Sequence, residues 1–148
     1  MKREFMKIAI KEAKKAYSAG EVPVGAVIVK DGEIVAKGRN TREKDNSALG
    51  HAEINAIKKA CKKLNSWRLD DCELYVTMEP CPMCAGAIIN ARIKTVVFGA
   101  FDATYGSFDS KINLAALYDF KPELYAGICE EECTLLVKNF FKEMRNDK

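Results

Sequence analysis

Two short motifs constrain this chain more than any other feature of its sequence: His51-Ala52-Glu53, and further along Pro80-Cys81-Pro82-Met83-Cys84. An imidazole and two thiols in Cys-x-x-Cys spacing are donor types that suit zinc. Three protein ligands leave one tetrahedral position open, which distinguishes a catalytic zinc from a structural one. A carboxylate two residues from the histidine is placed to move protons at metal-bound water. The predicted Zn²⁺ ligands are His51, Cys81 and Cys84, and the predicted catalytic acid and base is Glu53.

The histidine of the first motif is the only histidine in the chain. A lone histidine is more often a structural or surface residue than a ligand, but its position before Glu53 and upstream of Cys81 favours ligation. On an ideal helix His51 and Glu53 would point ~200° apart. We therefore expect His51 at or just before the first turn of a helix. Both thiols are expected in the first turn of another helix, where the positive helix end favours thiolates.

Composition limits the class of protein. The chain has 148 residues, 48% hydrophobic and 30% charged, which predicts a single soluble globular domain over residues 1–148. No apolar run approaches the ~20 residues of a membrane helix and no secretory segment opens the chain, so we expect a cytoplasmic protein without a membrane partner. A core of this size does not need disulfides, so the six cysteines are expected to be thiols or metal ligands. The net charge of +3 permits an RNA partner without demonstrating one.

Hydrophobic periodicity predicts an alternating α/β chain. We expect helices over residues 2–19, 51–64, 81–92 and 130–144, with weak helical character over 111–118. We expect strands over residues 24–29, 34–36, 72–77, 94–99 and 124–128. Asp31-Gly32 is a two-residue hairpin signal, which makes the first two strands antiparallel. The strand–helix–strand unit over 72–99 favours a parallel connection. The lysines of the first helix are either an RNA-facing stripe or, as ordinary charge patterning favours, a solvated surface.

The two motifs resemble those of the zinc-dependent cytidine and deoxycytidylate deaminase superfamily. Flanking stretches at 21–27, 74–80 and 85–87 extend the likeness over nearly the whole chain. Within the superfamily the sequence is most similar to the bacterial tRNA-specific adenosine deaminases. The resemblance implies a three-layer α/β/α cytidine-deaminase-like fold with a mixed five-stranded sheet, an antiparallel first hairpin and parallel last strands.

The resemblance also implies a reaction. Hydroxide adds at the amine-bearing carbon, Glu53 passes protons to the ring nitrogen and to the departing amine, and ammonia leaves. The implied substrate is adenosine at the wobble position of a tRNA anticodon stem-loop, converted to inosine. Such a base must be splayed out into the pocket, which an anticodon loop permits at low cost. A homodimer is implied, and no DNA partner is expected.

Substrate-facing residues are expected around the predicted zinc. In the resembled family an asparagine at the position of Asn40, in the loop 38–50, contacts the nucleoside, whereas a plain turn asparagine is the other interpretation. The loop 100–106 lines the entrance for the base, and Asp102 there is either a substrate contact or a capping or turn aspartate. The full set of predicted substrate-binding residues is Val24, Asn40, Ala52, Met78, Pro80, Phe101 and Asp102.

Two alternatives stay open at this stage. The stretches 106–111 and 121–124 depart from the resembled family, which leaves room for a deaminase of a free nucleobase or nucleoside such as guanine, cytosine or cytidine. A structural zinc module in a binding protein would need a fourth protein ligand, for which Cys72 is the best candidate. Cys61, Cys129 and Cys133 are assigned to packing.

Overall fold

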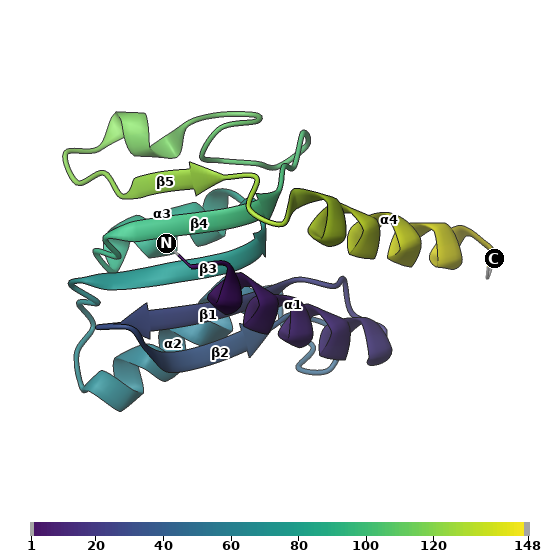
Figure 1. The fold of residues 1–148 in the computed structure, drawn as a ribbon, viewed down its shortest axis with the longest axis horizontal. Helices are drawn as coiled ribbons and strands as arrows, with labels where there is room; N and C mark the ends of the chain where they lie inside the picture. The colour runs from purple at the N-terminus through teal and green to yellow at the C-terminus, as the bar shows by residue number, and fades with distance from the viewer. Residues whose placement is uncertain (1, 147–148) are drawn as a thin grey trace.

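A computed structural model, in which residues 2–146 are described, contains one five-stranded sheet in the order β2-β1-β3-β4-β5 (Figure 1). The strands are β1 (Gly25–Lys30), β2 (Glu33–Arg39), β3 (Cys72–Met78), β4 (Thr95–Ala100) and β5 (Glu123–Ala126). β1 is antiparallel to both neighbours, whereas β3, β4 and β5 are mutually parallel. The predicted mixed sheet, with an antiparallel hairpin first and parallel strands last, is confirmed.

The hairpin between β1 and β2 turns at the predicted two residues. Asp31 and Gly32 both have positive φ, 52° and 77°, the conformation that a type I′ turn requires. β2 is longer than predicted, because its polar residues pair with β1 as far as Gly25↔Arg39. An edge strand tolerates exposed polar side chains, so a prediction from hydrophobic periodicity alone gave a strand that was too short.

Helices cover both faces of the sheet. α1 (Arg3–Ser18) and α4 (Glu130–Asn146) lie on one face, and α2 (Ala52–Leu64) and α3 (Pro82–Asn90) lie on the other (Figure 1). Alternation along β1 divides the core accordingly, since Val27 and Val29 pack under α1 while Ala26 and Ile28 pack under α2 and α3. This is the predicted three-layer α/β/α arrangement.

The remaining elements match the predictions less closely. Weak helical character over 111–118 resolves into one 3₁₀ turn, η1 (Leu114–Leu117), and the last strand is shorter than predicted. Cys129, which precedes α4, and Cys133, in its first turn, are buried in the core that α1 shares with the sheet, and Cys61 is half-buried, in agreement with packing roles. Across residues 2–146 no helix has both the length and the apolar character needed to span a bilayer.

Candidate active site

His51, Cys81 and Cys84 meet at the ends of two helices. Their ligand atoms all lie within 4.8 Å of one another. The His51 Nδ1 atom is 3.6 Å from the Cys81 sulfur and 3.4 Å from the Cys84 sulfur. One imidazole and two thiols so close together are the donor set of a zinc site, so the residues present fit the predicted ion.

Local backbone geometry places these side chains. His51 is the N-cap of α2 with extended φ and ψ of −93° and 150°, so it lies just before the helix, as predicted. Cys81 is the N-cap of α3 at −75° and 174°, and Pro82 begins the helix, where its missing N–H costs nothing. Cys84 follows within the first turn. The positive N-terminal end of α3 therefore lies beside the two sulfurs, and such a helix end favours thiolate.

The protonation of the two cysteines differs sharply. A hydrogen bond from Cys84, with a further one from His51, lowers the pKa of Cys81 to about 4 despite its burial. The same hydrogen bond and deeper burial raise the pKa of Cys84 well above its ordinary value. The pKa of His51 is raised, chiefly by its hydrogen bond to Cys81. Zinc binds thiolate and neutral imidazole, so zinc binding at this cluster would release protons.

Glu53 lies in the first turn of α2 and is only 4% exposed. Burial raises the pKa of its carboxyl to about 7, with a further upward contribution from the Cys81 thiolate. A carboxyl with a pKa near neutrality can both accept and return a proton, which is the property of a general acid and base.

Among residues 2–146, no fourth protein ligand belongs to this cluster. Cys72 begins β3, whereas Cys81 follows the far end of the strand, so about 20 Å of extended chain separates the two regions. Within the described part of the chain, the group that contains Cys81 consists of three residues. The structural-zinc alternative with Cys72 as fourth ligand is wrong.

Asn40 lies beside the start of α2, where it has a structural task. Its Oδ1 accepts a hydrogen bond from the Ala52 N–H at 2.9 Å, which satisfies one of the unpaired donors of the helix end. Its own N–H donates to the Val24 carbonyl at 3.2 Å. The structure thus brings three of the predicted substrate residues, Val24, Asn40 and Ala52, together next to His51.

The other predicted substrate residues lie across the site. Met78 ends β3 opposite Ala100, and Phe101 and Asp102 follow directly. Phe101 is 40% exposed and its ring meets Phe98 edge-on at 5.3 Å. Asp102 Oδ1 accepts hydrogen bonds from the N–H groups of Thr104 and Tyr105. Asp102 therefore stabilises a turn, which was one of the two roles expected from the sequence. Pro80 is buried and directly precedes Cys81.

Two buried glutamates near the site were not predicted. Glu79 is 3% exposed and its carboxylate accepts hydrogen bonds from the loop that follows β4. Glu21 is also 3% exposed and accepts from the N–H groups of Glu43 and Lys44 in the loop before α2. Glutamate is seldom fully buried without partners, but nothing in the sequence indicates which loop each carboxylate reaches.

Comparisons with known proteins agree with this geometry. The sequence profile of the cytidine and deoxycytidylate deaminase zinc-binding region matches residues 1–100. The chain is 49% identical over 146 residues to the tRNA-specific adenosine deaminase of Bacillus subtilis strain 168, covering 97% of this chain and 91% of that protein.

Two solved structures share the fold. One comes from studies of A-to-I editing by tRNA:A34 deaminases at the wobble position of transfer RNA; it has a TM-score of 0.89 and 39% identity, covering 91% of this chain and 99% of that one. The guanine deaminase of Bacillus subtilis has a TM-score of 0.66 and 44% identity, covering 82% and 72%. The profile match carries the zinc-ligand motifs that meet in the structure, and the chain belongs to the cytidine and deoxycytidylate deaminase family.

Proposed function

We propose that this protein is a zinc-dependent hydrolase that converts adenosine to inosine at the wobble position of a tRNA anticodon. The proposed chemistry rests on the cluster of three zinc-ligand atoms within 4.8 Å, with the buried Glu53 two residues after His51. The proposed substrate is supported by near-full-length similarity to tRNA-specific adenosine deaminases, at 49% identity for the Bacillus subtilis protein. In this proposal the chain acts as one catalytic domain in the cytoplasm, where tRNA is found.

In the proposed reaction His51, Cys81 and Cys84 hold the ion and Glu53 moves the protons. When bound, zinc supplies a Lewis acid that acidifies water toward a pKa of about 7. The Glu53 carboxylate takes a proton from the attacking water and returns protons to the ring nitrogen and the leaving amine. Ala52, which has no side chain beyond Cβ, leaves space for the base between His51 and Glu53.

The substrate pocket in this proposal has two walls. Val24 and Asn40 form one wall, with the side-chain amide of Asn40 positioned next to Ala52. Met78, Pro80, Phe101 and Asp102 form the other. The exposed ring of Phe101 offers an apolar surface for a base removed from the anticodon stack.

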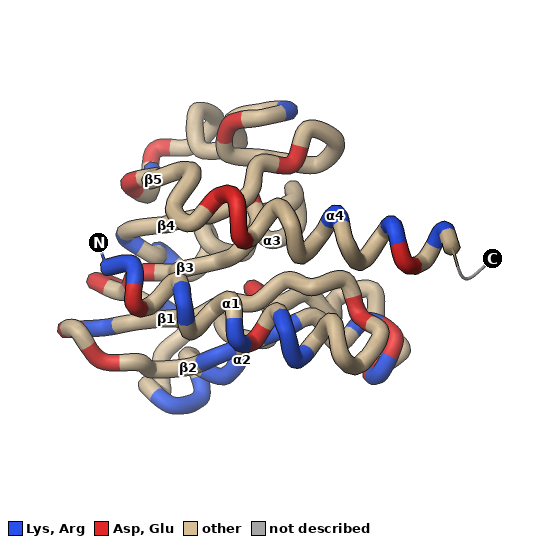
Figure 2. The backbone as a smooth tube through the Cα atoms, turned by 45° about the vertical axis from the view of Figure 1, so that its right-hand side comes forward, with Lys and Arg blue, Asp and Glu red and all other residues tan. Residues whose placement is uncertain are grey.

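The surface charge supports an RNA substrate. Figure 2 shows many of the Lys and Arg residues along α1, α2 and β2. A groove of about 290 Å³ there carries four basic side chains against one acidic side chain, and its lining residues are Arg39, Thr41, Lys44, Asp45, Asn55, Lys58 and Lys59. Clustered cations of this kind bind phosphodiesters in a salt-dependent manner.

The test is inosine formation on an anticodon stem-loop with adenosine at the first anticodon position. We expect wild-type turnover of this RNA, and no comparable turnover of free adenosine or free guanine. The variants Glu53→Gln and Glu53→Ala should keep one zinc per chain and lose turnover by at least about 100-fold, the contribution of general acid–base catalysis. Full activity of either variant would contradict the assigned role of Glu53.

The metal ligands are tested separately by replacing one proposed ligand and, as a control, one other cysteine. Cys81→Ala should lose bound zinc, whereas Cys72→Ala, at the other end of β3, should retain it. Equal zinc content in the two variants would refute the assigned ligand set.

Guanine deamination is the second candidate, because the solved guanine deaminase shares 44% identity over 82% of this chain. Steady-state kinetics with free guanine in the same assay decides between the two substrates. Turnover of guanine without turnover of the stem-loop would replace the proposed function with this one.

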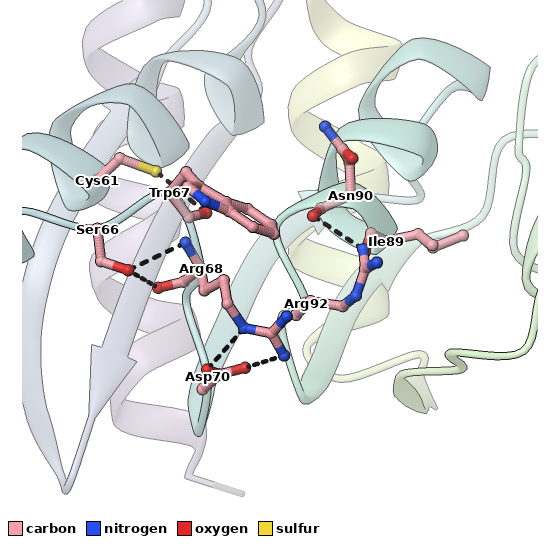
Figure 3. A network of polar contacts seen from close by, with 8 residues as sticks. All are labelled: Cys61, Ser66, Trp67, Arg68, Asp70, Ile89, Asn90 and Arg92. Carbon is pink, nitrogen blue, oxygen red and sulfur yellow. Dashed lines mark hydrogen bonds and ion pairs between the residues drawn. The ribbon is translucent and has the colours of Figure 1, made fainter.

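We also propose that a second copy of this chain binds to the outer side of α3. A groove of about 580 Å³ runs along α3, lined by Gly86, Ala87, Ile89, Asn90, Arg92, Tyr118, Asp119 and Phe120. Trp67 and Tyr118, which are 61% and 51% exposed, flank the groove with large aromatic surfaces. In Figure 3, Trp67 lies between the Cys61 region of α2 and the Asn90–Arg92 end of α3. Small helix residues beside exposed aromatics are typical of an interface between protein surfaces.

Gly86 provides a clean test of this interface, because a Cβ there meets nothing within 4 Å in the monomer. Gly86→Arg should give a monomer in sedimentation velocity experiments while Leu135→Arg, on the exposed side of α4, should remain a dimer. A wild-type protein that is monomeric at micromolar concentration would refute the proposed dimer.

A further inference from the structure

Glu79 connects two parts of the candidate active site that are far apart in the sequence. It follows β3 and stands two residues before the zinc-ligand candidate Cys81. Its carboxylate is 3% exposed and faces the loop formed by residues 101–110, here called the rim loop. The rim loop contains Phe101 and Asp102, the two residues proposed to contact the base.

The carboxylate holds the rim loop at both ends. Glu79 Oε1 accepts a hydrogen bond from the Asp102 N–H at 3.1 Å and one from the Ser110 hydroxyl at 2.5 Å. Glu79 Oε2 accepts from the N–H groups of Phe108, Asp109 and Ser110 at 3.3, 2.7 and 2.9 Å. Five donors from one loop therefore converge on a single side chain.

Gly106 shows how closely the loop approaches this side chain. A Cβ at Gly106 would lie 2.4 Å from the Glu79 Cδ and Oε1 atoms and 2.4 Å from the Asp102 carbonyl oxygen. The Ser107 N–H also donates to the Pro80 carbonyl at 2.9 Å, next to the metal-ligating segment. The rim loop is thus wrapped around the Glu79 carboxylate and fixed against the segment that leads to Cys81.

We propose that Glu79 is a positioning residue for the substrate: it fixes the rim loop, and with it Phe101 and Asp102, at a set distance from the zinc ligands. This inference rests on the proposed deaminase function. It assigns to Glu79 the placement of the pocket wall that receives the base, and no part in proton transfer. Loss of the anchor therefore weakens substrate binding while the zinc chemistry is retained.

Glu79→Gln is a sharp perturbation because a carboxylate only accepts hydrogen bonds, whereas an amide both accepts and donates. The amide oxygen can satisfy the three N–H groups of residues 108–110. The amide nitrogen then faces the Asp102 N–H, donor against donor, so the anchor at Asp102 is lost. The change in the loop is expected at residues 101–106, beside the base.

The first measurement is steady-state deamination of the anticodon stem-loop. For Glu79→Gln we expect KM to rise about tenfold, kcat to stay within about twofold, and zinc to remain at one equivalent. Ser110→Ala removes one of the five donors and should raise KM by less. Ile10→Ala, on the opposite face of the sheet, serves as the control for a general loss of stability and should change neither constant.

The second measurement is amide hydrogen exchange of the rim loop in the zinc-loaded protein. The amide of Asp102 should exchange at least about tenfold faster in Glu79→Gln than in Ile10→Ala at equal distance from the melting temperature. Unchanged exchange at Asp102, an unchanged KM, or a fall in kcat that parallels loss of zinc would each overturn the inference. Failure of the proposed function appears differently, as absent inosine with wild-type protein, and the exchange experiment then still decides whether Glu79 anchors the loop.

Discussion

Gly38 controls how closely the helix that carries Glu53 approaches the sheet. It lies on β2 facing α2, and a Cβ at this position would lie 2.4 Å from the Ala52 carbonyl oxygen. The same Cβ would lie 2.7 Å from the Ala56 nitrogen and 3.1 Å from the Ala56 Cβ. These are mostly backbone atoms of the first turns of α2, so no flexible side chain can move aside. Gly38→Ala therefore forces the helix away from the strand.

The size of the effect follows from these distances. Ordinary contact begins near 3.4 Å, so the start of α2 must retreat by about 1 Å. Overpacking of this kind costs about 1–3 kcal/mol of unfolding free energy, or about 2–10 °C in melting temperature for a chain of this length. The same movement carries His51 and Glu53, and a misplacement of about 1 Å at a reacting group can cost about 100-fold in rate. We expect turnover per folded molecule to fall about 10- to 100-fold.

Gly25→Ala is the matched control on the other face of the sheet. A Cβ at Gly25 would lie 2.0 Å from the Ala9 carbonyl oxygen and 2.5 Å from the Ala13 nitrogen, so it displaces α1. This variant should lose at least as much stability but keep near wild-type turnover per folded molecule. Both are compared by thermal unfolding of the zinc-loaded protein and by single-turnover deamination well below either melting temperature. Wild-type single-turnover rates in Gly38→Ala would show that this contact does not place the catalytic helix, and the reasoning would fail.

Three further predictions concern stability and metal binding. Asn40→Ala should cost about 1 kcal/mol through loss of the cap on Ala52; Asn40→Asp should restore thermal stability but not turnover, since it keeps the acceptor and lacks the amide donor proposed to contact substrate. At Glu12, burial raises the pKa but hydrogen bonds from Lys15 and Arg39 outweigh it, so the pKa is lowered. Because the folded pKa of Glu12 lies below the unfolded value of 4.5, the stabilisation by this carboxylate is present above pH 4.5 and is lost as pH falls through the folded pKa. Glu12→Gln should therefore lower the free energy of unfolding, measured in urea, by about 1 kcal/mol at pH 7 and by progressively less in acid. Chelation should lower the melting temperature until zinc is restored, and calorimetry in buffers of different ionisation enthalpy should show proton release on zinc binding.

The zinc-ligand motifs could be predicted because imidazole and thiol groups are the donor types that zinc prefers, and because the residues within each motif are close in sequence. His51 before the helix followed from a geometric conflict: on a regular helix it would point away from Glu53. The hairpin at Asp31-Gly32 was equally local, since two residues of positive φ define the turn.

Contacts between distant segments could not be predicted in the same way. Glu79 reaches Ser110, 31 residues away, and Glu21 reaches Lys44, 23 residues away. The sequence alone does not distinguish a solvated glutamate from a buried one, because burial depends on which loops fold over the carboxylate. Asn40 illustrates a different limit, because one side chain caps a helix and also lies next to the proposed substrate, so the two interpretations of the sequence were not exclusive.

Strand register explains why the site forms where it does. Gly25 of β1 pairs with Arg39 of β2 and lies level with Thr77 of β3, to whose hydroxyl its N–H donates at 3.1 Å. Met78 pairs in turn with Ala100 of β4. β2, β3 and β4 therefore run in the same direction and end at one edge of the sheet.

Each of these strand ends leads into a different part of the site. β2 leads through the loop containing Asn40 to His51, β3 leads through Glu79 to Cys81, and β4 leads to Phe101 and the rest of the rim loop. A slip of one residue in the β1–β3 pairing would shift the residues that follow β3 by about 3.3 Å relative to those that follow β2. It would also turn the side chains of one strand to the opposite face of the sheet. The core prevents such a slip, because Ala26 and Ile28 fit beneath α2 while Val27 and Val29 fit beneath α1. The same alternation of side chains that forms the two halves of the core therefore also fixes the proposed metal ligands, the proposed catalytic acid and the proposed base-binding wall relative to one another.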